Sequence, residues 1–402
     1  MSQALPSTCR RTAMLLCIAL LCASGAAAET TKIRFWDTQR KGANQQNSGH
    51  HAEWYVAAQA LGLDYVRLLP DAWPAEEKDF LIGDADSFEQ INETDLSRLT
   101  EALDEAQRNG IKVALAMLSL PGARWKQLNA DQDDTRLWED RRYHRQAFEF
   151  WRQLAARLKG HPAIVAYNPL NEPHPDRAFG FDAPDGDFAA WFLRIQDTPA
   201  DLNRFNRDMV DAIRSVDADT PIILDGWFYA SPQAFTYNRP VADDRVLYAF
   251  HNPGPWQMTT YRVNQGRYAY PDRVPKRWDG PTESWTTDRL AQEVLAVEAF
   301  AKKYNIPANR IIASEFWYDR RLEGAAAYFA DLIQIYNQRG WHWAFYAFRG
   351  SGAWTGLDYE IPPGHKMGWR YWQAVENGGD PEPLKPRGTN PLWDILRREF
   401  AE

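Results

Sequence analysis

Short apolar, β-rich runs alternate along this chain with longer amphipathic stretches, and this alternation restricts the fold more than any other feature. Eight β-rich runs occur, at residues 40–44, 64–69, 111–118, 163–168, 221–224, 246–250, 310–313 and 342–347. Amphipathic stretches between them cover residues 51–61, 92–108, 139–159, 201–217, 287–303 and 323–339. Regular alternation of this kind is typical of a parallel sheet whose strands are joined by helices.

The number of strands makes the prediction more specific. Eight strand–helix units predict a single (β/α)8 TIM barrel of the α/β class. The helix after the fifth strand has the least clear pattern. An open doubly wound sheet is the alternative, but no glycine-rich phosphate turn follows the first strand.

The first 28 residues have the pattern of a secretory signal peptide. Arg10 and Arg11 precede an apolar run, and small residues follow up to Ala28, which predicts cleavage after that residue. The run is too short for a mature membrane anchor, although an uncleaved anchor is the alternative. We therefore expect a secreted or periplasmic protein in which residues 29–402 form one domain.

Composition excludes several other classes of protein. All three cysteines lie in the first 28 residues, so the remaining chain has no disulfide, thiol nucleophile or cysteine metal site. A formal net charge of -8 argues against a nucleic-acid partner. With no linker, repeat, zinc-binding histidine pattern or Gly-x-Ser-x-Gly motif, we expect a monomer without metal or cofactor.

Functional residues of a (β/α)8 barrel lie at the C-terminal ends of its strands. Two carboxyl groups stand at such positions, because Glu172 follows the fourth apolar run and Glu315 the seventh. Glycoside hydrolysis requires such a pair, one acid to protonate the leaving oxygen and one to attack the sugar or activate water. Either glutamate could instead be structural. The same rule selects Asn44, Arg67, Asn171, Trp227, His251, Tyr346 and Arg349.

Taken in order, these motifs resemble glycoside hydrolase family 5, the cellulase and β-mannanase family. The resemblance rests on Asn171-Glu172-Pro173 and on the runs at 40–44, 66–68, 248–251, 314–316, 341–346 and 354–360. It covers most of the chain after residue 28. It implies a catalytic barrel over residues 29–402 and a retaining mechanism.

The resemblance also implies a role for each site residue. Glu172 would be the acid/base and Glu315 the nucleophile, with their carboxyl groups about 5–5.5 Å apart. Asn171 would bind the sugar 2-hydroxyl, and His251 would line the site. Arg67 would hold Glu315 ionised, as an adjacent cation does.

Three positions depart from the family pattern. The third strand ends in Leu118-Ser119, where the family often has histidine. Pro253 stands where a tyrosine usually follows the sixth-strand histidine, and Tyr346 where a tryptophan platform is common. These departures affect the residues that contact the sugar, so they leave the identity of the sugar open.

The chain has 18 tryptophans, whose flat rings can stack on sugar rings. We expect Trp227, Trp256 and Trp354 to contact substrate together with Tyr346, although each ring could simply pack its loop. Four further tryptophans fall in loops expected on the same face, namely Trp73, Trp125, Trp285 and Trp317.

The sequence thus predicts a glycosidase whose partner is a β-linked polysaccharide or oligosaccharide, with an endo-β-1,4-glucanase as the leading hypothesis. A β-mannanase or an exopolysaccharide β-glycosidase is the alternative within the family. A non-catalytic sugar-binding barrel is the alternative outside enzymes, although both acids are present.

Overall fold

The computed structural model describes residues 32–45, 49, 52–179, 187–252, 254–275 and 280–401. The expected signal peptide, residues 1–28, and Pro253 lie outside these residues. All described residues belong to one compact unit, Thr31–Glu402. Within them, none of the helices combines the length and apolar character that a membrane crossing needs.

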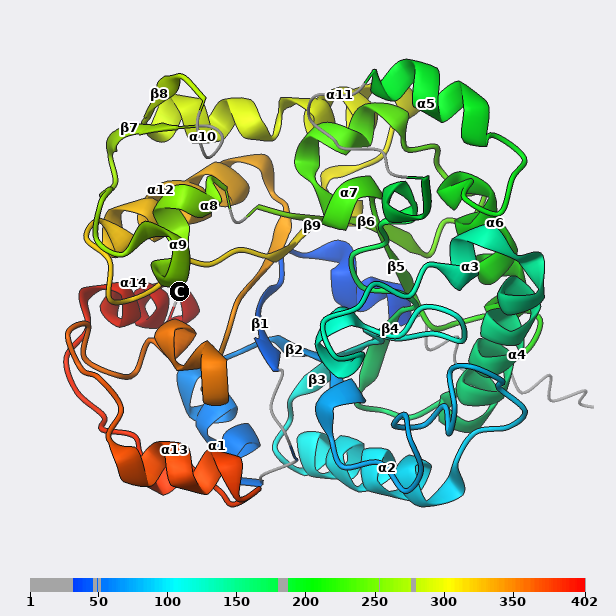
Figure 1. The fold of residues 1–402 in the computed structure, drawn as a ribbon, viewed down its shortest axis with the longest axis horizontal. Helices are drawn as coiled ribbons and strands as arrows, with labels where there is room; N and C mark the ends of the chain where they lie inside the picture. Colours follow the sequence, from blue (N-terminus) through cyan, green and yellow to red (C-terminus); the bar gives the residue numbers. More distant parts are fainter. Residues whose placement is uncertain are drawn as a thin grey trace, which may run out of the picture. The chain divides into compact units, whose positions relative to one another are not determined.

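Eight parallel strands close into a barrel with helices around it (Figure 1). The strands are β1 (Lys41–Gln45), β2 (Tyr65–Leu68), β3 (Lys112–Ala116), β4 (Ile164–Asn168), β5 (Ile222–Asp225), β6 (Val246–His251), β9 (Ile311–Glu315) and β10 (His342–Phe345). Their order is that of the chain, and β1 pairs with β10 to close the barrel. The predicted (β/α)8 fold is confirmed, and each predicted β-rich run overlaps one barrel strand.

The outer helices bury one face against the barrel. They are α1 (Ala52–Leu61), α2 (Glu93–Arg108), α3 (Arg136–Glu139), α4 (Arg141–Leu158), α5 (Phe188–Ile195), α6 (Leu202–Arg214), α10 (Thr287–Glu293), α11 (Leu295–Tyr304), α12 (Ala325–Arg339), α13 (Trp369–Glu376) and α14 (Pro391–Ala401). In α6, Leu202, Phe205 and Met209 are buried at helical spacing, and the Asp201 side chain caps the first turn.

Two connections differ from a regular strand–helix repeat. Between β5 and β6 stand only α7 (Trp227–Ala230) and the 3-10 helix Pro232–Tyr237. The ring of Phe300 in α11 packs on Phe235 of that 3-10 helix, with centroids 5.4 Å apart. Between β6 and α10 lie α8 (Trp256–Thr259), α9 (Tyr261–Asn264) and an unpredicted antiparallel hairpin, β7 (Asp272–Pro275) with β8 (Thr282–Trp285).

One tryptophan closes the N-terminal end of the barrel. Trp36, in the 3-10 helix Lys32–Asp37, is fully buried, and its Nε1–H donates to the carbonyl of Val165 at 3.0 Å. Its ring lies 5.1 Å from that of Tyr65 and 4.9 Å from that of His342, the first residues of β2 and β10. The C-terminal ends of the strands are thereby left as the open end.

We expect Trp36→Ala to lower the free energy of unfolding by about 3–5 kcal/mol, because it removes a buried ring and leaves a cavity. Urea unfolding followed by circular dichroism measures this loss. Trp369→Ala is the matched control, since that ring is 68% exposed and its loss should change stability by no more than about 0.5 kcal/mol. Equal losses in both variants would contradict the closing role of Trp36.

Candidate active site

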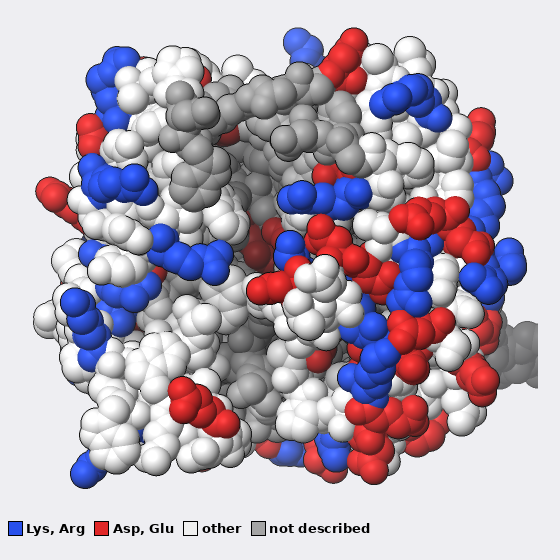
Figure 2. Space-filling view, in the orientation of Figure 1, with Lys and Arg blue, Asp and Glu red and all other residues white. Residues whose placement is uncertain are grey.

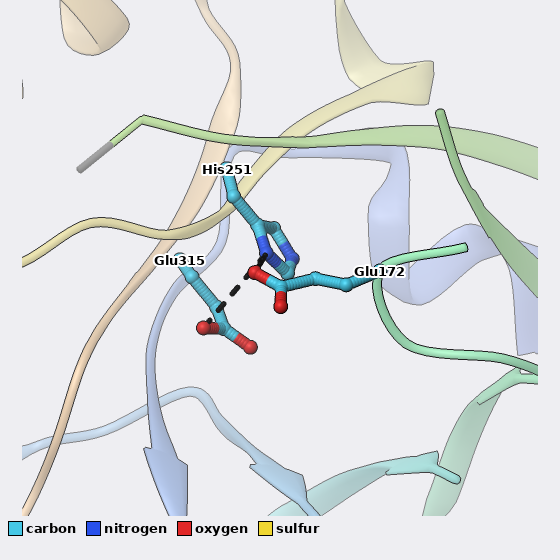
Figure 3. A group of neighbouring side chains, drawn as sticks. All are labelled: Glu172, His251 and Glu315. Carbon is cyan, nitrogen blue, oxygen red and sulfur yellow. Dashed lines mark hydrogen bonds and ion pairs between the residues drawn. The ribbon is translucent and has the colours of Figure 1, made fainter. Parts of the chain in front are cut away.

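Side chains from three strand ends meet at the open end of the barrel. Glu315 is the last residue of β9 and His251 the last of β6, while Glu172 follows β4 by four residues. The three side chains point toward one another, with the imidazole beside both carboxyl groups (Figure 3). One oxygen of each glutamate and one ring nitrogen of His251 all lie within 4.8 Å of one another.

One face of the molecule is recessed. In the orientation of Figure 1, the face is hollowed near its centre, and acidic atoms lie at the bottom of the hollow (Figure 2). Glu315 is buried, whereas Glu172 is only half-buried. A ligand at this site therefore meets Glu172 at a more accessible position than Glu315.

The backbone at Glu172 has a left-handed conformation, with φ of +48°. This conformation costs a residue other than glycine about 1–3 kcal/mol, so surrounding contacts must hold it. The Glu172 N–H donates to Oδ2 of Asp225 at 3.0 Å, and its carbonyl lies 2.8 Å from Nδ1 of His174. The turn aims the carboxyl group at His251, whose Nδ1 is 2.7 Å from Oε1 of Glu172.

Arg67, in β2, is fully buried, and its guanidinium donates hydrogen bonds to several side-chain oxygens. It donates to Oδ1 of Asn168 at 2.9 and 2.6 Å, to Asn44 at 3.1 Å and to Asn171 at 2.7 Å. Its Nη1 also donates to Oε1 of Glu315 at 2.5 Å. A guanidinium carries five N–H donors in a rigid plane, so this set fixes the position of the Glu315 carboxyl group.

Glu315 and His251, the two titratable groups at the strand ends, each have a pKa that is shifted by opposing effects. Burial raises the pKa of Glu315, while the charges of His251 and Arg67 act in the opposite direction. Burial alone would lower the pKa of His251, but the carboxylate charges around it are stronger and raise it. Arg67 therefore opposes the effect of burial on Glu315, as expected of an adjacent cation, but the pKa of Glu315 remains raised.

A third buried carboxyl group, Asp225, was not among the expected site residues. It ends β5 and accepts hydrogen bonds from Nδ2 of Asn168 at 3.1 Å and from the Glu172 N–H at 3.0 Å. Its Oδ2 lies 3.6 Å from Nη2 of Arg67 and 3.5 Å from Nε2 of His251. The strand-end rule could have found it, because it directly follows a run of apolar residues.

Four aromatic rings form a row beside the two glutamates. Centroid distances are 6.2 Å from Trp256 to Trp317, 5.9 Å from Trp317 to Tyr346, and 5.6 Å from Tyr346 to Trp354. The N–H of Tyr346 donates to the carbonyl of Phe316, the residue after Glu315, at 2.9 Å. Burial raises the pKa of Tyr346, and the charges of the glutamates raise it further. Trp256 is 46% exposed at one end of the row, and Trp354 is partly buried at the other.

Trp227 does not reach this row. Its ring is fully buried and packs edge-on against Trp191 at 5.7 Å and Phe192 at 5.8 Å. This corrects the prediction that Trp227 contacts substrate, because the ring has no exposed face. Trp73 and Trp285 are buried in the same way. Trp125 lies 6.3 Å from the ring of His174, which stacks on Tyr229 at 4.7 Å.

The end of the third strand, where a family histidine is missing, has a buried contact of its own. Asp71 accepts hydrogen bonds from the N–H groups of Leu118 at 3.0 Å and Ser119 at 2.8 Å. Burial raises the pKa of Asp71 to about 7, although both hydrogen bonds oppose the rise. The side chain of Ser119 accepts a hydrogen bond from the N–H of Trp125 at 3.0 Å. Ser119 therefore links the end of the third strand to the loop that carries Trp125.

Glu172, His251 and Glu315 have the donor types and spacing of a metal-binding group. In this structure, however, Nδ1 of His251 faces Oε1 of Glu172, and Glu315 is paired with Arg67. These contacts are those of groups that share protons and charge. The expectation that no metal is needed stays a prediction.

Two facing carboxyl groups at the open end of a (β/α)8 barrel, beside a row of aromatic rings, define a site of the glycoside hydrolase class. The chain matches the family model described as cellulase (glycosyl hydrolase family 5) over residues 30–352. It therefore belongs to glycosyl hydrolase family 5, which confirms the resemblance seen in the sequence.

Curated relatives with this similarity are endoglucanases. Endoglucanase C from Acetivibrio thermocellus is 25% identical over 226 residues, which are 55% of this chain and 57% of that protein. Endoglucanase C307 from Clostridium sp. (strain F1) matches to the same extent. The chain thus matches 57% of the length of these relatives.

Solved structures share the fold over more of the chain. A glycoside hydrolase structure has a TM-score of 0.61 at 17% identity and covers 90% of this chain and 99% of its own. Endoglucanase Cel5A from Thermotoga maritima has a TM-score of 0.59 at 17% identity and covers 82% and 93%. The cellulose synthase subunit Z from Clostridioides difficile has a TM-score of 0.57 at 16% identity and covers 80% and 94%.

We expect Arg67→Gln to raise the pKa of Glu315 further, because burial then acts without its nearest opposing charge. Arg67→Lys, which keeps a cation, should raise this pKa less. A carbon-13 NMR titration of labelled glutamate carboxyl groups measures the shift.

Arg214→Gln is the matched control for this titration. Arg214 pairs with Asp243 at 2.6 Å, away from the glutamates, so its loss should leave the titration of Glu315 unchanged. An unchanged pKa of Glu315 in Arg67→Gln would show that the guanidinium does not stabilise the carboxylate.

Proposed function

We propose that this chain is a retaining glycoside hydrolase that cleaves β-linked polysaccharide through Glu172 and Glu315. The observation that supports it most directly is that the two carboxyl groups approach within 4.8 Å across the open end of the barrel. Retaining enzymes hold their carboxyl groups about 5–5.5 Å apart, whereas inverting enzymes need about 6.5–9.5 Å to admit water. The short approach is closer to the spacing of a retaining pair and favours retention.

The two glutamates differ in ways that suit different steps. Glu315 is buried and hydrogen-bonded to Arg67, so it is positioned to attack the anomeric carbon as a carboxylate. Glu172 is more accessible and donates its proton to the leaving oxygen as the glycosidic bond breaks and a glycosyl ester forms on Glu315. Glu172 then removes a proton from water, which attacks the ester and releases Glu315.

Asn171 is placed to bind the sugar held in this step. Its Oδ1 accepts from Nη2 of Arg67, which leaves the amide N–H groups to donate to a substrate hydroxyl. A hydrogen bond to the 2-hydroxyl that strengthens in the transition state would increase the rate rather than only the affinity.

A β-1,4-glucan is the substrate that the comparisons favour. The curated relatives are named endoglucanases, and the aromatic row offers flat faces to a chain of pyranose rings. Structures of Thermotoga maritima Cel5A exist with cellobiose and with mannotriose, so a β-mannan is the second candidate. We further propose that residues 1–28 are removed during export, so that the enzyme acts outside the cytoplasm.

We expect Glu172→Ala and Glu315→Ala each to lower kcat on the preferred polymer by about 10³-fold or more, because each removes one half of the acid–nucleophile pair. The assay uses carboxymethylcellulose, mixed-linkage β-glucan, glucomannan and galactomannan. Glu101→Ala, an exposed change on α2, is the matched control and should keep full activity. Activity that survives in either site variant would overturn these assignments.

Proton NMR during hydrolysis of a cello-oligosaccharide tests the stereochemistry. We expect the β-anomer to form first, because two inversions at the anomeric carbon restore its configuration. Azide should also restore turnover of 2,4-dinitrophenyl β-cellobioside by Glu172→Ala, giving the β-glycosyl azide. Early release of the α-anomer would instead show an inverting mechanism.

We expect Trp256→Ala to raise KM for the preferred polymer roughly 3- to 10-fold with little change in kcat, because one stacking face is lost away from the reacting bond. Initial-rate kinetics on soluble polymer measure the split. Trp369→Ala serves as the control, since Trp369 is an exposed tryptophan on α13, outside the row. A fall in kcat at constant KM would contradict a role in binding alone.

A further inference from the structure

Asp225 has no part in the two-glutamate reaction, yet it lies at the centre of the group that performs it. Its side chain is completely buried, and it contacts the Glu172 backbone, Asn168, Arg67 and His251. A buried carboxyl group is costly unless it is paired and hydrogen-bonded, so its presence here requires a reason.

The contacts of Asp225 fit an ionised carboxylate. Oδ1 accepts from Nδ2 of Asn168, and Oδ2 accepts from the Glu172 N–H. The nearest other groups, Nη2 of Arg67 and Nε2 of His251, are nitrogens that carry protons when charged. A protonated carboxyl group would need an acceptor, and among these four partners only Nε2 of a neutral His251 is one, at the long distance of 3.5 Å.

The Asp225 carboxylate changes the balance of positive and negative charges in the site. Arg67 and His251 supply two positive charges, while Asp225, Glu172 and Glu315 are three carboxyl groups. Two more titratable groups lie beside them: Tyr346 stays neutral because its pKa is raised, and His174 stays neutral because burial lowers its pKa. A buried excess charge is unfavourable, so the group is balanced when one carboxyl group keeps its proton.

The contacts also indicate which carboxyl group keeps that proton. Asp225 accepts hydrogen bonds with both oxygens, and Glu315 is bonded to Arg67 at 2.5 Å. Glu172 faces Nδ1 of His251 at 2.7 Å rather than a guanidinium. The proposed function requires the remaining proton on Glu172, the acid of the reaction. Without Asp225, two cations would balance two carboxylates, and Glu172 would lose its proton more easily.

We propose that Asp225 is a positioning residue that keeps one proton on the Glu172–His251–Glu315 group, so that Glu172 is ready to act as an acid. The proposal rests on the proposed function. Asp225 acts through Glu172 in a second way as well, because its hydrogen bond to the Glu172 N–H holds the left-handed turn.

The test is Asp225→Asn, compared with the unaltered enzyme in pH profiles of kcat/KM. We expect the basic limb to move to lower pH by about 1–2 units, because the loss of a nearby negative charge makes Glu172 release its proton sooner. At neutral pH, cello-oligosaccharide hydrolysis should fall about 10- to 100-fold and should recover as the pH is lowered. Hydrolysis of 2,4-dinitrophenyl β-cellobioside, whose leaving group needs no proton, should fall less than about threefold.

Two further variants separate charge from structure. Asp225→Glu keeps the charge, so its basic limb should stay in place even if kcat falls. Asp217→Asn is the matched control, because Asp217 is also buried and accepts from the Tyr167 hydroxyl and the Thr220 N–H, both at 3.0 Å. It should lower stability without moving the basic limb.

A nitrogen-15 NMR titration measures the pKa of His251, and so detects the charge of Asp225 without any substrate. We expect Asp225→Asn to lower the pKa of His251, because a carboxylate 3.5 Å from Nε2 is lost. An unmoved basic limb, or equal losses on both substrates, would overturn the proposal. An enzyme inactive on every substrate but with this shift in His251 would instead overturn the proposed function and leave the effect of Asp225 on the proton count supported.

Discussion

The buried guanidinium of Arg67 is the interaction on which the rest of the site depends. It binds side chains of Asn44, Asn168 and Glu315 and so joins β2 to β1, β4 and β9. Removing one partner of a buried ion pair costs about 3–5 kcal/mol, because the remaining charge stays unpaired. The strand ends must therefore keep their register for the cation to remain satisfied, and this requirement couples the stability of the barrel to the geometry of its acids.

Most of the fold could be predicted because strands buried on both faces read as continuous apolar runs. The β5–β6 connection could not be predicted, since its 3-10 helix is held by Phe300, a residue distant in sequence, rather than by a helical pattern of its own. The hairpin of β7 and β8 was also missed. Its strands are mostly exposed and carry no alternation that would distinguish them from a loop.

The site could be predicted where a residue type and a strand end coincide, as at Glu172 and Glu315. Asp225 met the same rule, so the sequence could have indicated it too, but its contacts with Glu172 and His251 are visible only in the structure. Trp227, two residues further on, was assigned to the site instead. The left-handed residues 228–230 that follow it turn the chain there, and the indole lies among buried rings, a direction that composition does not encode.

Closure of the barrel through β1 and β10 has a consequence for the order of folding. Lys41 pairs with Trp343, which the ribosome adds only after it has made all of the chain between them. Until then, the first strand has a free edge and the ring of Trp36 lacks one of its walls, His342. Contacts this distant in sequence slow folding and leave apolar surface open to other chains. The nascent protein is thus exposed to aggregation until β10 has been made and has paired with β1.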